Sequence, residues 1–454
     1  MTAPPRAGVG YRNTECRDSW GLPTSSPEPL ALLTQELRMP RLGCTPSPLA
    51  PPTRSGGPRW LARRLAPILA ALLVAALGCR EDAESPTAPE PGPALATSAT
   101  PALAFYQVSG GQQHTCGVTT DNRAYCWGFN FYGQLGDGTT TQRPTPFPVA
   151  GTLRFRQVSA GDNHTCGVTT DYRAYCWGSG VDGELGDGTA TDRLTPVPVA
   201  GGRQFRQVDG GGYHTCGVSY PDNRAYCWGY NGTDALGDGT STSRSTPVAV
   251  SGGRQFRQVT AGGFHTCGVT TSDKAFCWGW GRYGQIGDGS TSFHPTPSPV
   301  AGTRQFRQVD AGLYHTCAVT TDDRAFCWGD GRNGQMGDGN TKLSSMPRAV
   351  AGGLHFSRVS TAGSHTCGET TGNRAYCWGG NTYGQLGDGT TTQRLTPVAV
   401  AGGLFFSQVS AGGSHTCGRT AAAVAYCWGL NSEGELGDGT ATNRVRPVAV
   451  AGPM

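Results

Sequence analysis

The sequence repeats one unit of about fifty residues seven times between Phe105 and the C-terminus. A period of this size indicates a supersecondary unit whose copies pack against one another to bury their apolar faces. Positions at which the copies agree therefore predict scaffold, and positions at which they differ predict function. Successive copies are marked by one histidine each, fifty residues apart except for one step of fifty-one: His114, His164, His214, His265, His315, His365 and His415.

Each copy contains four short segments that favour β-structure, namely Phe-Arg-Gln-Val, His-Thr-Cys-Gly-Val-Thr, Arg-Ala-Tyr-Cys-Trp and Pro-Val-Ala-Val or close variants. Gly, Asp and Asn separate these segments, and no helical period is present. Four short strands in one unit are typical of a propeller blade. An open solenoid would need distinctive terminal copies, whereas the first and last copies resemble the others. The sequence predicts an all-β fold, a seven-bladed β-propeller over residues 104–454.

Cysteine occurs 17 times, and fourteen of these residues form one pair per copy. Nine residues separate Cys116 from Cys126, so a three-residue hairpin loop, 120–122, would place them opposite each other on neighbouring strands. The last position of such a loop favours a left-handed backbone, which Asn and Asp tolerate. The residues at this position are Asn122, Tyr172, Asn223, Asp273, Asp323, Asn373 and Ala423, so five of the seven copies have Asn or Asp there.

One disulfide per copy is therefore predicted, and disulfides persist in oxidising compartments. The third copy has one additional residue in its loop, which should leave its cysteines within reach. The predicted pairs are Cys116–Cys126, Cys166–Cys176, Cys216–Cys227, Cys267–Cys277, Cys317–Cys327, Cys367–Cys377 and Cys417–Cys427.

The repeated histidine allows two interpretations. His114 and Cys116 lie on one strand face with Cys126 opposite, and all three are zinc ligands. Alternatively, the histidine makes a hydrogen bond to the backbone of the next blade. We favour the hydrogen bond, and we expect no metal and no cofactor.

The first hundred residues differ from the repeats. Residues 1–58 are rich in Pro, Ser and Arg, and we interpret them as disordered or as upstream of the true start. Residues 59–79 combine basic residues with an apolar run and end at Gly78-Cys79, which is typical of a secretory signal. The end of this segment is similar to a lipobox and predicts lipidation at Cys79, with simple cleavage as the alternative. Residues 80–103 predict a disordered tether. The protein is thus expected in the bacterial cell envelope, lipid-anchored or secreted.

No catalytic motif is present in the sequence, so we expect a protein that is not an enzyme. The net charge of +4, with no basic run inside the repeats, argues against a nucleic-acid partner. One aspartate recurs in all seven Gly-Asp-Gly turns, and we interpret it as a turn cap because calcium would need more hard ligands. These residues are Asp137, Asp187, Asp238, Asp288, Asp338, Asp388 and Asp438.

The segment from Trp378 to Gly389, Trp-Gly-Gly-Asn-Thr-Tyr-Gly-Gln-Leu-Gly-Asp-Gly, resembles the repeat of the regulator of chromosome condensation family. The resemblance covers residues 104–452 and implies a seven-bladed propeller. The cysteine pairs depart from the eukaryotic archetype and fit an exported bacterial branch. The archetype is a nucleotide-exchange factor for a nuclear GTPase, acting through an insertion that is missing here. A secreted β-lactamase inhibitor with similar repeats implies instead that aromatic loops bind a protein.

Two positions vary freely between fixed flanks: the residue before each histidine and the loop after each Cys-Trp-Gly. Loops on a rigid scaffold often hold binding residues, and Tyr, Trp and Arg are common anchors. We predict a monomer that binds a protein, or a glycan, through variable loops on one face of the propeller. An exchange regulator of a small GTPase is the alternative. Packing of these aromatics against the next blade is the competing interpretation. The predicted patch comprises Tyr213, Tyr230, Phe264, Trp280, Arg282, Tyr314 and Arg332.

Overall fold

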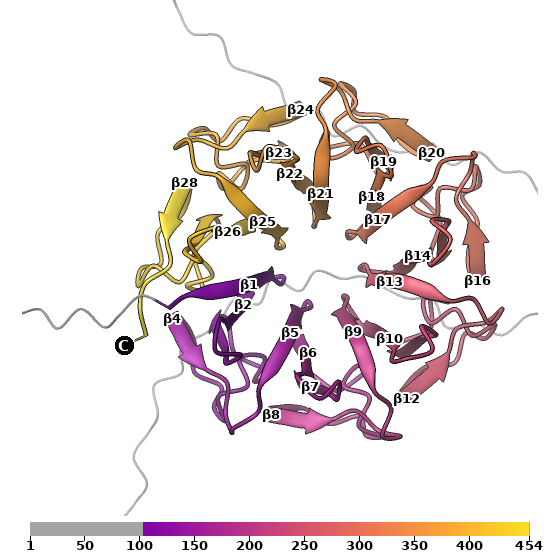
Figure 1. Ribbon diagram of the computed structural model, residues 1–454, viewed down its shortest axis with the longest axis horizontal. Coiled ribbons are helices and arrows are strands. Elements are labelled where there is room, and N and C mark those ends of the chain that lie inside the picture. Colours follow the sequence, from indigo (N-terminus) through magenta and orange to yellow (C-terminus); the bar gives the residue numbers. More distant parts are fainter. Residues whose placement is uncertain (1–102, 454) are drawn as a thin grey trace, which may run out of the picture. The chain divides into compact units, whose positions relative to one another are not determined.

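A computed structural model describes residues 103–453. Within them, twenty-eight strands form seven four-stranded antiparallel sheets that surround a central axis as the blades of a propeller (Figure 1). The predicted fold is confirmed. The predicted signal segment, Cys79 and nearly all of the predicted tether lie outside the described residues. No helix in the described part of the chain has the length and apolar character needed to cross a membrane.

The strands follow one another in the same order in each blade, so blade 1 contains β1–β4 and blade 7 contains β25–β28. Their bounds are β1 Phe105–Gly110, β2 His114–Thr119, β3 Ala124–Gly128, β4 Arg143–Pro148, β5 Phe155–Ala160, β6 His164–Thr169, β7 Ala174–Gly178, β8 Arg193–Pro198, β9 Phe205–Gly210, β10 His214–Ser219, β11 Ala225–Gly229, β12 Arg244–Ala249, β13 Phe256–Ala261, β14 His265–Thr270, β15 Ala275–Gly279, β16 His294–Pro299, β17 Phe306–Ala311, β18 His315–Thr320, β19 Ala325–Gly329, β20 Ser344–Ala349, β21 Phe356–Thr361, β22 His365–Thr370, β23 Ala375–Gly379, β24 Arg394–Ala399, β25 Phe406–Ala411, β26 His415–Thr420, β27 Ala425–Gly429 and β28 Arg444–Ala449.

The first strand of each blade lies nearest the axis and the fourth lies at the periphery (Figure 1). The fourth strand differs from the sequence prediction. In blade 3 it begins at Arg244, three residues before the predicted Pro-Val-Ala-Val segment, and ends before Val250. An irregularity in the ladder explains the difference, because Cys227 pairs with Val248 whereas Gly229 pairs with Arg244. The bulge lets the segment before the proline join the sheet.

The hairpin between the second and third strands forms as the cysteine spacing predicts. Cys116 lies opposite Cys126 in the β2–β3 register, and a disulfide joins them with a Cα–Cα distance of 4.1 Å. The last loop residue has a positive φ in all seven blades, from Asn122 to Ala423. The other six predicted pairs are also joined, including Cys216–Cys227 with its longer loop.

The apolar core lies between blades, so each cluster draws on two copies. Between blades 1 and 2, the disulfide of Cys116 and Leu135 pack against Phe155 and Trp177 of the next blade. The cluster between blades 7 and 1 is built in the same way and includes Trp127. Since every blade is one complete repeat, the ring closes through this ordinary blade-to-blade contact.

A glutamine on the inner strand of six of the seven blades adds polar contacts between blades. Gln107 donates to the Val158 carbonyl at 2.7 Å and accepts from the Val158 amide at 2.9 Å. In blade 6 an arginine, Arg358, takes the place of the glutamine. Its cross-strand partner Glu369 is buried and accepts the Val409 amide at 3.3 Å. The paired substitutions thus keep one of the two contacts.

The order of strands defines two faces of the ring. The turns between first and second strands and the loops between third and fourth strands lie at the same strand ends; we call this side the loop face. The three-residue hairpins between second and third strands lie at the other ends, on the side we call the hairpin face. Both variable positions found in the sequence therefore belong to the loop face.

Candidate functional site

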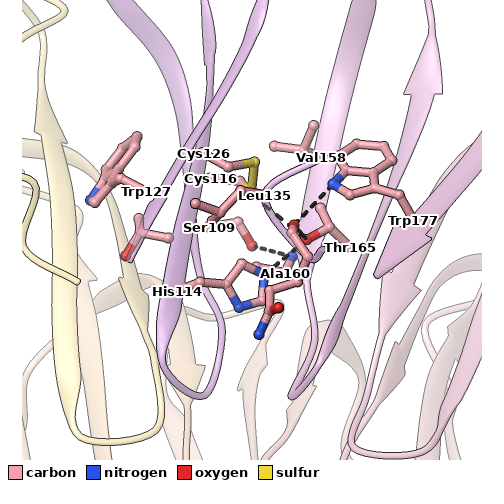
Figure 2. Close-up of a disulfide and its surroundings, with 12 residues drawn as sticks. Ser109, His114, Cys116, Cys126, Trp127, Leu135, Val158, Ala160, Thr165 and Trp177 are labelled. Carbon is pink, nitrogen blue, oxygen red and sulfur yellow. Dashed lines mark hydrogen bonds between the residues drawn. A yellow bond between two sulfur atoms is a disulfide. The ribbon is translucent and has the colours of Figure 1, made fainter. Parts of the chain in front are cut away.

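The repeated histidine joins neighbouring blades through a side chain, not through the backbone as predicted. His114 Nε2 lies 2.8 Å from Thr165 Oγ1 of the next blade (Figure 2). The Thr165 hydroxyl donates to the Gln134 carbonyl at 2.8 Å, and the same carbonyl accepts the Trp177 indole N–H at 2.9 Å. Because the hydroxyl has one hydrogen, it must accept from the imidazole, which is therefore protonated at Nε2.

All seven histidines make this contact, and the His415–Thr115 pair completes the circle. We call this set the histidine belt. Burial lowers the pKa of each belt histidine to about 3 or 4. With Nε2 engaged and both sulfurs of each blade in a disulfide, the three-ligand zinc arrangement is chemically unavailable. The belt is scaffold.

The recurring aspartate caps its turn, which confirms the sequence interpretation. Asp137 Oδ1 accepts the Thr139 amide at 2.9 Å and the Thr139 hydroxyl at 2.8 Å. Its Oδ2 forms an ion pair with Arg143 at 2.8 Å, a contact that the repeat pattern had not suggested. The hydrogen bonds and the arginine lower the pKa of Asp137, although burial opposes them. This carboxylate has its partners within its own blade.

The predicted aromatics of blades 3 to 5 form one continuous cluster on the loop face. Phe264 is central: its ring centroid lies 5.6 Å from that of Tyr213 and 5.9 Å from that of Tyr314. Trp280 makes edge contacts with Phe264 at 5.1 Å and with Tyr314 at 5.5 Å. Tyr230 extends the cluster, with its centroid 6.2 Å from that of Tyr213. These rings thus pack against one another across blades and stay outside the inter-blade cores.

Two further aromatics belong to the cluster but were left out of the predicted patch. Tyr283 lies 5.2 Å from Tyr314, and Phe293 lies 6.5 Å from Trp280 and is 48% exposed. Tyr283 occupies the same variable loop as Trp280, so its position was a usable signal. Phe293 precedes strand β16, and only the fold brings it close. We call the full set the aromatic ridge: Tyr213, Tyr230, Phe264, Trp280, Tyr283, Phe293 and Tyr314.

The two predicted arginines differ in their contacts. The Arg332 guanidinium carbon lies 4.8 Å from the centre of the Tyr283 ring, and the group forms an ion pair with buried Asp330 at 2.9 Å. Arg332 therefore borders the ridge in a fixed orientation. Arg282 is exposed and makes no hydrogen bond or ion pair within residues 103–453. The structure thus joins Arg332, but not Arg282, to the predicted aromatics.

A closed ring of seven near-identical four-stranded blades defines a seven-bladed β-propeller. The family model for the RCC1-like domain matches residues 74–367 and 207–454. The chain belongs to the RCC1-like domain family. Among curated proteins, no sequence matches this one.

Solved propellers share the fold at low sequence identity. Prp20p from Saccharomyces cerevisiae is 19% identical with a TM-score of 0.65, and the match covers 73% of this chain and 87% of that one. The same yeast protein bound to Kap60 gives a TM-score of 0.64 at 19% identity, covering 72% and 83%. Human WBSCR16 is 22% identical with a TM-score of 0.65, covering 73% and 94%. At these identities the similarity concerns the fold.

Proposed function

We propose that this protein is a non-enzymatic binding propeller that engages a protein partner through the aromatic ridge. The observation that carries the proposal is the continuity of seven aromatic side chains across blades 3 to 5. Tyr213 is 40% exposed and Phe293 is 48% exposed, so the ridge presents apolar surface to solvent. Tyr and Trp on a rigid support are the side chains that dominate the energetics of protein interfaces.

The environment of the perturbed carboxyl groups supports a binding role over catalysis. Burial raises the pKa of Asp209 to about 6 and that of Asp310 to about 7. Yet Asp209 accepts the Ser159 hydroxyl at 2.9 Å and the Ala261 amide at 2.8 Å, both from adjacent blades. Thr361 donates its hydroxyl and amide to Asp310 in the same manner. These acids are committed to joining blades.

Export to the cell envelope is part of the proposal. Seven disulfides are compatible with an oxidising compartment. The intact mass of protein from the membrane fraction, before and after reduction and alkylation, tests this part. A chain that begins at a lipidated Cys79, with fourteen cysteines alkylated only after reduction, is expected. Fourteen free thiols on an unprocessed chain would contradict export.

The alternative function is exchange of guanine nucleotide on a small GTPase. It rests on the likeness to Prp20p, whose structure is described together with its binding to Gsp1p and histones. A chain with free thiols would favour this alternative over the exported binder. A glycan in place of the protein partner would be detected by glycan-array binding that depends on the same ridge.

Capture of the partner tests the leading proposal. Immobilised full-length protein should retain a defined partner from envelope extracts, and Trp280→Ala with Tyr314→Ala should remove that retention. The matched control changes Tyr172→Asn and Tyr220→Ser, which removes a stacked aromatic pair, 4.2 Å between centroids, from the hairpin face. Equal retention by the ridge variant and the control would overturn the proposal. A large loss of thermal stability in the ridge variant would assign these rings to the core.

A further inference from the structure

The axis of the ring opens on the loop face into a cavity of about 90 Å³. Turns from all seven blades line it, and nearly every lining residue is glycine, alanine or threonine. The exceptions are Gln112, Asp162 and Leu313, so Asp162 is the one ionisable residue of the described chain in this lining. A cavity of this size suits a small chemical group and not a folded segment.

The Asp162 carboxylate is held in place but is not neutralised. The backbone amide of Asp162 donates to the Gly211 carbonyl of blade 3 at 3.1 Å, and this bond fixes the turn that carries the carboxylate. A methyl group added at Gly212 would lie 3.2 Å from Asp162 Oδ2, so the carboxylate rests against the backbone of the next blade. No side chain within residues 103–453 forms an ion pair with it, whereas the turn-capping aspartates have cationic partners. Desolvation at this partly exposed position raises the pKa of Asp162 to about 6.

The aromatic ridge begins at the residue that follows Gly212, the backbone neighbour of this carboxylate. Tyr213 is the first ring of the row Tyr213, Phe264 and Tyr314, which follows the turns of three successive blades. Burial, with a contribution from the Asp162 charge, also raises the pKa of Tyr213. A negative charge in a small cavity, with an aromatic side chain on the residue that follows the lining residue Gly212, favours a cation.

We propose that the axial cavity receives the guanidinium of an arginine side chain from the partner protein, paired with Asp162 and stacked on Tyr213. This inference rests on the proposed function and specifies the chemistry of the partner's anchor. A planar guanidinium can bond a carboxylate through two N–H groups and stack on a ring at the same time, which an ammonium cannot. The unpaired carboxylate supplies the charge complementarity, and the aromatic ridge covers the remaining apolar contact.

A small probe isolates this contact from the rest of the interface. The acetylated and amidated peptide Gly-Gly-Arg-Gly-Gly is titrated into the full-length protein at low ionic strength by calorimetry. Counterparts with citrulline, which is uncharged but of similar shape, and with lysine serve as comparisons. The variants are Asp162→Asn and Tyr213→Ser. Asp171→Asn is the matched control, since Asp171 lies in the hairpin loop of the same blade, on the hairpin face, beside Arg173.

The arginine peptide should bind wild type at least tenfold more tightly than the citrulline or lysine peptide. Asp162→Asn and Tyr213→Ser should each weaken it at least tenfold, and Asp171→Asn should leave it unchanged. No binding by wild type, or equal affinity in Asp162→Asn, would overturn the inference. Equal affinity for the lysine peptide would overturn the assignment to arginine. If the variants at Trp280 and Tyr314 still remove partner capture in any of these cases, the proposed function stands without it.

Discussion

Blades 3 to 5 and blades 6 to 7 share one backbone but present different surfaces. In blade 3 the Tyr230 amide donates to the Tyr213 carbonyl at 2.9 Å, and in blade 6 the Gly380 amide donates to the Ser364 carbonyl at 2.9 Å. Aromatic side chains therefore are not needed to hold the loops. Since the same main-chain bond forms with tyrosine in blade 3 and with serine in blade 6, the side chain at this position is free to differ, and the ridge is a property of the surface.

The largest effect is expected from two tryptophans that lie two residues apart. Trp278 is fully buried and donates to the Ala235 carbonyl at 2.9 Å, so Trp278→Ala should lower the free energy of unfolding by about 3–5 kcal/mol. Trp280 is only half-buried on the loop face, so Trp280→Ala should cost about 1 kcal/mol. Urea unfolding of both variants measures the difference. Similar losses would mean that the ridge is part of the core.

The pH dependence of stability should reflect two opposed sets of buried groups. The belt histidines have a pKa near 3 or 4 in the fold and about 6.5 when unfolded, so the unfolded chain binds more protons below pH 6.5. Stability contributed by the neutral belt is thus lost as pH falls from 6.5 toward 3. Five carboxyls act in the opposite direction because their pKa is raised to about 6 or 7: Asp162, Glu184, Asp209, Asp310 and Glu369.

The melting temperature should therefore decline gently from pH 6.5 to 4. It should decline steeply below pH 4, because the five carboxyls are then protonated in the unfolded chain as well and no longer offset the loss from the histidines. Asp310→Asn removes one opposing group, so its melting temperature should fall more steeply between pH 7 and 4 than that of wild type. Thermal melts across the range measure both slopes. A wild-type profile that is flat down to pH 3 would show that the belt histidines are not held neutral.

The smallest effect is expected where blade 7 is made to resemble blade 3 on the loop face. Ser414→Tyr places in blade 7 the residue that blade 3 carries at Tyr213, on a partly exposed turn. Because the backbone bond from the Leu430 amide to the Ser414 carbonyl, 2.9 Å, does not involve the side chain, stability should change by less than about 0.5 kcal/mol. A larger loss in a thermal melt would mean that blade 7 is constrained at this position.

Contacts within one blade could be predicted from the sequence with good precision. The spacing of Cys116 and Cys126 predicted both the hairpin register and the left-handed loop residue. The aspartate turns were predicted as well, although their basic partners, six arginines and His294, were missed. The fourth strand was placed too late because a bulge at Cys227 and Gly229 has no sequence marker. The candidate surface was predicted as a set of variable positions, but its extent was not.

The sequence by itself determined the repeat, the blade, the disulfides and the number of blades, because these depend on spacing along the chain. Only the tertiary structure decided which residues meet across blades. His114 takes Thr165 as its partner, Phe293 reaches Trp280, and Asp162 lies against Gly212. Each of these contacts depends on how far one blade is rotated against the next. Packing of the inter-blade core sets that rotation, and no spacing within a single repeat encodes it.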